Sequence, residues 1–240
     1  MLKQEDYKQH ISARFNNELE GIKNHLLEMG GKVEEQLSAA IEALVERDSG
    51  AAEEIINRDQ EVNRMEMRID DEAATILARR QPAASDLRLV VTVIKINTDI
   101  ERIGDEAAKI ARQAVKLSEE GTSPTDFVEI RHIGTHVGKM LRDALDAFAR
   151  LDVNLAVDVV REDSRVDREY GSAMRSLVTF MMEDPRDIGA ILNEMWALRS
   201  LERIGDHASN IAEHVVYLVQ GMDVRHQSLD ELLDQVNEQL

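Results

Sequence analysis

The stretch IERIGD at residues 100–105 determines how the rest of the chain is interpreted, because it returns as LERIGD at residues 201–206. Further upstream, AIEALVERD at 40–48 resembles ALDAFARLD at 144–152, with an offset of 104 residues in place of 101. Self-similarity over such a length is the signature of a repeated structural unit. The chain is therefore predicted to contain two copies of one unit, the second with a shorter loop.

Composition and periodicity predict that every regular element is a helix. Hydrophobic residues make up 43% of the 240 residues but aromatic residues only 3%, and there are three prolines. This is the composition of long helices. No stretch alternates apolar and polar residues as a strand does, and we expect the first helix to continue through Gly30 and Gly31. Six helices are expected, at about residues 6–47, 51–80, 85–118, 126–151, 152–183 and 185–221.

Turn signals divide the chain into three parts. The clearest linker is EEGTSPT at residues 119–125, where Gly, Ser and Pro cluster. We therefore expect a first three-helix unit at 1–120, a second at 121–221 and an acidic tail at 222–240. Residues 1 to about 20 have no counterpart in the second unit, so they either extend the first helix beyond its bundle or hold a partner.

The ends of the helices carry recognisable signals. Asp152 is expected to cap the fifth helix, and Asp184 is expected to cap the sixth, with Pro185 at its first position. Pro82 ends the second helix, and Ser85 or a neighbour is expected to cap the third.

Several classes of protein are excluded or disfavoured by what the chain lacks. There is no cysteine, which excludes disulfides, thiolate zinc sites and cysteine nucleophiles. No uncharged apolar run approaches the length of a membrane span, and the first residues have no signal core, so we expect a soluble cytoplasmic protein. A formal charge of −18 argues against nucleic acid as a partner. Phosphate-binding glycine loops and hydrolase or kinase signatures are missing, so no enzyme is predicted.

The repeated hexapeptide places acidic side chains on one face of a helix. Glu101 and Asp105 are four residues apart, as are Glu202 and Asp206, and residues at this spacing lie one helical turn apart. Both pairs flank the apolar stripe of their helix. Gly104 and its counterpart Gly205 cost helix stability, which indicates close approach of another helix or a ligand, with local packing as the alternative.

A second acidic set faces inward on the preceding helix of each unit. At 100° per residue, Asp163 and Asp167 lie at about 40° and about 80° from Val159, inside or beside the apolar stripe. Asp59 and Asn63 occupy the matching positions in the first unit, and Glu66 and Asp70 continue the same line.

Inward carboxylates are costly unless a cation or several donors satisfy them. The candidates are an arginine, Arg102 or Arg203, and a bound metal ion. Oxygen ligands favour hard cations such as magnesium, calcium, manganese or iron.

Histidines provide a further candidate site. Glu129, His132 and His136 form an ExxH pattern followed by a histidine one turn later, as di-iron carboxylate bundles have on two helices. Residues 28–32, the matching part of the first unit, have no histidine, so the second half of such a site is missing. His207 and His214 are expected at the surface.

These features together resemble the PhoU family over about residues 8–226. The resemblance rests on the tandem ERIGD helices, the paired Asp-xxx-Asn/Asp positions, QPAASDLRLV at 81–90 and REDSRVDREY at 161–170. It implies an all-α fold of two tandem antiparallel three-helix bundles, side by side. It also implies two metal clusters, with iron, manganese, magnesium or zinc as occupants. One would use Asp59, Asn63, Glu101 and Asp105; the other would use Asp163, Asp167, Glu202 and Asp206.

The resemblance also implies a role. PhoU proteins mediate between a phosphate ABC transporter, through its ATPase subunit, and a membrane sensor histidine kinase. They prevent the phosphate-starvation response when phosphate is plentiful, restrain uptake and often form homodimers. Two other classes remain open. One is a metal-binding carboxylate bundle with iron storage or redox activity. The other is a structural bundle, in which alanine at Glu101, Asp105, Glu202 and Asp206 would change neither stability nor metal content.

Overall fold

The computed structural model describes residues 4–120 and 125–222, with side chains from residue 13 onward. In these ranges all regular structure is helical, which confirms the all-α prediction. The linker residues 121–124 and the predicted tail beyond Met222 lie outside them. The elements are α1 (Gln4–Glu46), α2 (Ser49–Arg80), α3 (Ala84–Glu119), α4 (Val128–Arg150), α5 (Val153–Glu183), a 3₁₀ turn at Pro185–Asp187, and α6 (Ile188–Gln220).

Helix starts follow the capping signals in part. The Asp152 side chain accepts a hydrogen bond from the Leu155 N–H at 3.1 Å, as predicted. Asp184 accepts one from the Arg186 N–H, but it caps the 3₁₀ turn and α6 begins three residues after Pro185. The expected Ser85 cap is wrong, because α3 already begins at Ala84 and has no side-chain cap.

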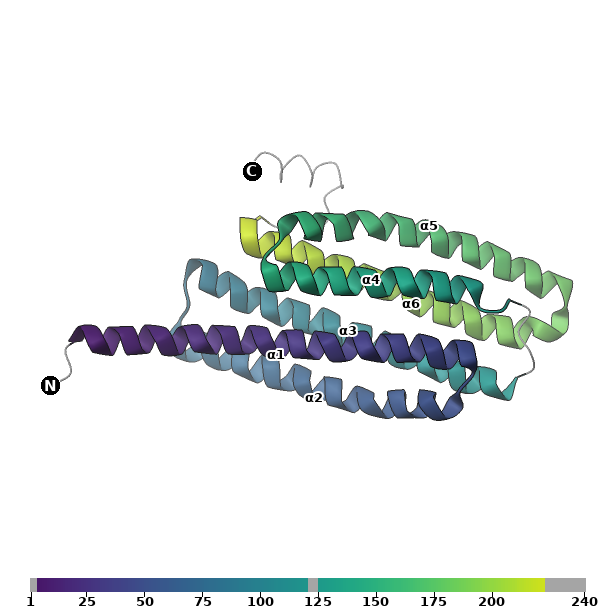
Figure 1. Ribbon diagram of the computed structural model, residues 1–240, viewed down its shortest axis with the longest axis horizontal. Coiled ribbons are helices and arrows are strands. Elements are labelled where there is room, and N and C mark those ends of the chain that lie inside the picture. Colours follow the sequence, from purple (N-terminus) through teal and green to yellow (C-terminus); the bar gives the residue numbers. More distant parts are fainter. Residues whose placement is uncertain (1–3, 121–124, 223–240) are drawn as a thin grey trace.

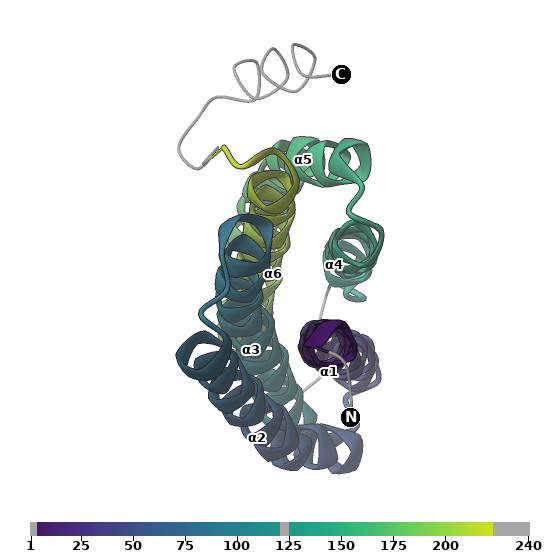
Figure 2. The same ribbon diagram turned by 90° about the vertical axis from the view of Figure 1, so that its left-hand side faces the viewer.

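The helices form two antiparallel bundles that share one curved layer. α1 to α3 make the first bundle and α4 to α6 the second, and all run along the long axis of the molecule (Figure 1). Viewed along that axis, α2, α3, α6 and α5 follow one another in a curved row, and α1 and α4 lie on its inner side (Figure 2). The seam between α3 and α6 therefore joins the two bundles at the centre of the outer layer.

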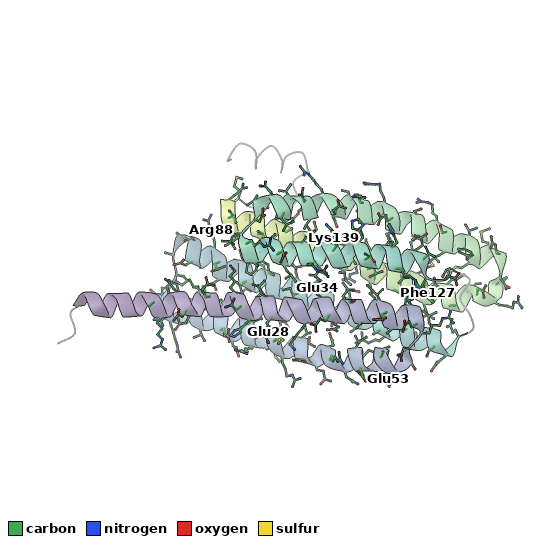
Figure 3. All side chains as sticks on the ribbon, viewed as in Figure 1. Glu28, Glu34, Glu53, Arg88, Phe127 and Lys139 are labelled. Carbon is green, nitrogen blue, oxygen red and sulfur yellow. The ribbon has the colours of Figure 1, made fainter. Side chains whose placement is uncertain are left out.

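The contact between α1 and α4 shows an approximate two-fold relation between the bundles. A Cβ atom at Gly30 would lie 2.7 Å from the Leu145 side chain, and one at Gly134 would lie 2.8 Å from Ile41. By the 104-residue offset, Gly30 corresponds to Gly134 and Ile41 corresponds to Leu145, so the two contacts are equivalent. Gly30 thus allows close packing against α4, and α1 continues through Gly30 and Gly31 as expected. Glu34 reaches from α1 towards α4, where it pairs with Arg142 (Figure 3).

The bundles differ most in their first helix. α1 has 43 residues and α4 has 23, and the first turns of α1 project beyond the ends of α2 and α3 (Figure 1). From residue 4 onward, the N-terminal residues without a counterpart therefore extend the first helix. Among the described residues, no helix is long and apolar enough to cross a membrane.

Candidate metal centres

Glycine lets the second and third helices of each bundle approach each other at the acidic positions. A Cβ atom at Gly104 would lie 3.3 Å from Val62 on α2, and one at Gly205 would lie 3.4 Å from Val166 on α5. The close approach predicted from the two hexapeptides is therefore that of a neighbouring helix. It places the carboxylates of α3 beside those of α2, and the carboxylates of α6 beside those of α5.

Asp59 forms the buried part of the first cluster. Its side chain accepts a hydrogen bond from Gln36 Nε2 at 3.2 Å, and the same amide nitrogen lies 3.3 Å from the Gly104 carbonyl oxygen. Burial raises the pKa of Asp59, and the negative charge of Asp105 raises it further. The sequence did not identify Gln36, because it comes from α1 and no repeated motif marks it.

The acidic residues of the first cluster interact through their charges. Burial raises the pKa of Glu101, with further increases from Asp105, Glu66 and Asp59. Burial also raises the pKa of Glu66, and Asp70 and Asp105 add to it. Glu66 thus belongs to the first cluster, although the sequence only placed it on the same line as Asp59.

The second cluster is the more compact of the two. Asp167, Glu202 and Asp206 each offer an oxygen within 4.8 Å of the others. Asp167 does not face inward as expected but is exposed, because it lies at the edge of the apolar stripe of α5. Asp163 lies deeper, and burial, followed by the charges of Asp206 and Asp167, raises its pKa to about 7. In the described part of the chain, no other three acidic or histidine side chains come this close together.

Both clusters contain buried oxygen atoms that fit a hard cation. Asn63 Oδ1, Asp163 Oδ1 and Glu202 Oε2 are buried without a hydrogen-bond partner. Leaving such atoms unsatisfied costs about 1–3 kcal/mol each. Carboxylate and amide oxygens are ligands that hard divalent cations prefer, so the donor set fits the metals expected from the sequence.

The arginines expected to neutralise the clusters form no ion pair with the predicted ligands among the described residues. Arg203 pairs with Glu106, at 3.1 Å between Nε and Oε1, and Arg102 forms no ion pair with the described acidic residues. Instead Arg199, which the sequence did not single out, pairs with Glu202 at 2.8 Å and lies over the ring of Tyr170. Among the described residues, Arg199 is therefore the only cation that forms an ion pair with a predicted ligand of either cluster.

The candidate ExxH trio does not come together among the described residues. His136 contacts Glu162 at 2.7 Å through Nε2 and Glu169 at 3.0 Å through Nδ1, and His132 lies 3.4 Å from Glu169. Glu129 is not among their partners. These histidines therefore connect α4 to α5 through contacts with two glutamate side chains.

His207 and His214 are not surface residues, contrary to the expectation from the sequence. Both are buried at the seam, where His207 Nδ1 lies 2.9 Å from Asp99 Oδ1 and His214 Nε2 lies 3.4 Å from Asp99 Oδ2. A spacing of seven residues puts both on the face of α6 that meets α3. This spacing was the available signal, but it has meaning only once the neighbouring helix is known.

Comparison with known proteins agrees with the repeat and the fold. The family described as "PhoU domain" matches residues 26–114 and 130–215, one segment in each bundle. The chain is 57% identical over 236 residues to the phosphate-specific transport system accessory protein PhoU homolog of Pseudomonas putida, covering 98% of this chain and 92% of the relative. It is 48% identical over 223 residues to PhoU of Escherichia coli, covering 93% and 92%.

Two solved structures have the same arrangement of helices. The crystal structure of PhoU from Pseudomonas aeruginosa has a TM-score of 0.85 and 59% identity, with 87% of this chain and 100% of that chain covered. The phosphate transport system regulatory protein PhoU from Streptococcus pneumoniae has a TM-score of 0.80 and 31% identity, with 87% and 98% covered. Fold, duplicated motif and near-complete coverage agree: the chain belongs to the PhoU family.

Proposed function

We propose that this protein is a regulatory accessory protein of a phosphate-specific transport system, with no catalytic role of its own. The observation that carries the proposal is the identity of about half or more, over nearly the whole chain, to relatives named for that role. In this proposal the protein acts in the cytoplasm as a homodimer, and its partners are the transporter's ATPase subunit and a sensor histidine kinase. It restrains uptake and keeps the starvation response off when phosphate is plentiful.

The acidic clusters give this adaptor two sites for metal ions. Iron, manganese and magnesium match the oxygen ligands, and zinc remains a candidate. When bound, such an ion supplies positive charge between two neighbouring helices. Asp163, Asp167, Glu202 and Asp206 would hold one site; Asp59, Asn63, Glu101 and Asp105 would hold the other, with Glu66 beside them. The iron storage or redox alternative is disfavoured because the second ExxH half-site that di-iron bundles use is missing from residues 28–32.

Alkaline phosphatase activity in cells tests the regulatory role. We expect low activity in phosphate-rich medium when the gene is present and high activity when it is deleted, with low activity restored by the gene on a plasmid. Low activity in the deletion strain would contradict the proposal and would move the metal-binding bundle to first place.

A further inference from the structure

Exposed apolar side chains gather at one end of the second bundle, where α5 ends and α6 begins (Figure 1). Of the ten large hydrophobic residues that are exposed in the described part of the chain, half lie there: Val178, Met182, Ile188, Leu192 and Trp196. We call these five residues the tip patch. Spacings of four residues put the members from each helix on one face of that helix. Such a gathering marks a binding surface, because single exposed apolar residues are normally scattered.

The fold does not require large apolar side chains at all of these positions. The repeat offsets of 104 and 101 residues give the equivalents in the first bundle. In the same order as the patch, they are Ala74, Ala78, Leu87, Val91 and Lys95. Two alanines and a lysine thus stand where the second bundle has Val178, Met182 and Trp196, although the helices are arranged in the same way. The tip patch is therefore a feature of the second bundle alone, and we interpret it as an interaction surface.

Two arginines continue the patch along α5. Arg175 lies seven residues before Met182, and Arg168 lies seven residues before Arg175, so the three follow one line along the helix. Both arginine side chains are exposed, and neither forms an ion pair with any described residue. A partner with an apolar stripe and acidic residues would therefore match the patch and the arginines beside it.

The C-terminal segment of the chain has this composition. Residues 228–240, which lie outside the described ranges, read SLDELLDQVNEQL, with four acidic residues and no basic residue. Ser228 followed by Glu231 is a sequence signature of a helix start. The spacing of the aliphatic residues would put them all on one face of a helix. They are Leu229, Leu232, Leu233, Val236 and Leu240. The sequence thus predicts an acidic amphipathic helix that needs an apolar surface.

This segment is too far from the tip patch of its own chain to cover it. Leu192, at the centre of the patch, lies 28 residues before Gln220, which is about 42 Å along α6. The connection from Met222 to Leu229 spans at most about 25 Å, and a helix from Leu229 to Val236 adds about 10 Å. Even with the connection fully extended, the apolar stripe would leave most of the patch uncovered. A second copy is the partner that can bring the two surfaces together.

We propose that residues 228–240 of one copy dock on the tip patch of a second copy, and that the exchange is reciprocal. The patch and the end of α6 lie at opposite ends of the molecule (Figure 1). Two copies side by side in opposite directions therefore place each segment at the other copy's patch, in a closed two-fold pair. The inference rests on the homodimer of the proposed function and deepens it by naming the two surfaces that meet.

Sedimentation equilibrium of the full chain tests the interface, with one variant for each of the two surfaces. Trp196→Asp alters the patch, and Leu233→Asp alters the segment. Val128→Asp is the matched control, because Val128 is 62% exposed, as Trp196 is, but lies on α4 outside the patch. Circular dichroism checks that each variant keeps the helical content of the wild type.

We expect dimers of the wild type and of Val128→Asp. Trp196→Asp and Leu233→Asp should each raise the dissociation constant by roughly 100-fold or more, because a dimer contains two copies of the altered contact. An equimolar mixture of these two variants should dimerise more tightly than either variant alone, since one intact segment then meets one intact patch.

Three results would overturn the proposal: a monomeric wild type, a Leu233→Asp dimer of wild-type affinity, or a mixture that dimerises no better than its components. The second result would show that the patch pairs with another patch or that a different surface holds the copies together. The homodimer of the proposed function would then still stand. The phosphatase assay in cells tests the regulatory role independently of all three.

Discussion

The two acidic clusters occupy equivalent places in the two bundles but have different side chains. Asn63 of the first cluster stands where the second has Asp167, and Glu66 stands where the second has Tyr170. The second cluster also has Arg199, which pairs with Glu202. The repeated backbone therefore determines where oxygen ligands gather, and individual substitutions determine the charge at each site.

The charges of the second cluster are held together at a cost. Three carboxylates are close to one another, and Asp163 below them has a pKa of about 7. In the folded protein this carboxyl group keeps its proton to a higher pH than in the unfolded chain. Ionising it therefore opposes folding unless a cation is present. The first cluster has one carboxylate fewer among the four predicted ligands. We therefore expect the first cluster to bind metal more weakly than the second and to destabilise the metal-free protein less.

The largest expected difference is in metal content. Asp163→Ala removes a half-buried ligand of the compact cluster and should weaken metal binding by roughly tenfold or more, since even outer partners of metal ligands contribute that much. Asp59→Ala should have the smaller effect, because its cluster already contains Asn63. Element analysis of the two purified variants, beside the wild type, measures this. Equal losses would remove the distinction between the clusters, and no loss in either would favour a purely structural role for the acidic residues.

The next effect is on the metal-free protein, with EDTA present. The pKa of Asp163 is raised from an ordinary value of 3.8 to about 7, so the folded state binds more protons than the unfolded state between these values. The resulting stabilisation is complete below pH 3.8 and is lost as pH rises through 7. Asp163→Asn should remove this dependence and, at pH 7.5, raise the free energy of unfolding by about 1–2 kcal/mol after allowance for solvent screening.

Urea unfolding at pH 5.5 and pH 7.5 measures the effect, with Asp59→Asn as the matched control. The control should gain less stability, because the hydrogen bond that Asp59 accepts from Gln36 offsets part of the rise in pKa that burial causes. If Asp163→Asn is no more stable than the wild type at pH 7.5, repulsion within the second cluster is not a significant contribution.

The smallest expected effect distinguishes the two glycines. Alanine is favoured over glycine in a helix by about 1 kcal/mol. At Gly205 the new methyl group would meet Val166 at an ordinary 3.4 Å, whereas at Gly104 it would meet Val62 at a tighter 3.3 Å. Gly205→Ala should therefore be at least as stable as the wild type, and Gly104→Ala should be about 0.5–1 kcal/mol less stable than Gly205→Ala. Thermal unfolding compares them; the reverse order would show that the second bundle is packed more tightly.

Local patterns in the sequence determined much of this structure. Helix periodicity and turn signals predicted all six helices, and the matching motifs predicted the duplication. The positions of Asp59, Asp163 and the ERIGD carboxylates followed from counting residues around a helix. These predictions succeeded because each depends on the geometry of a single helix, which the backbone repeats whatever surrounds it.

Only the tertiary structure decided which helices meet and what their polar residues contact. The clusters gain three residues from neighbouring turns or helices: Gln36, Glu66 and Arg199. Arg203 forms an ion pair with Glu106 and not with a predicted ligand. His207 and His214 were expected at the surface because a helix wheel shows polarity but does not show which partner covers it. The seam between α3 and α6 buries them beside Asp99. A side chain's partner depends on contacts between residues about a hundred positions apart, and a single sequence does not encode these in any local pattern.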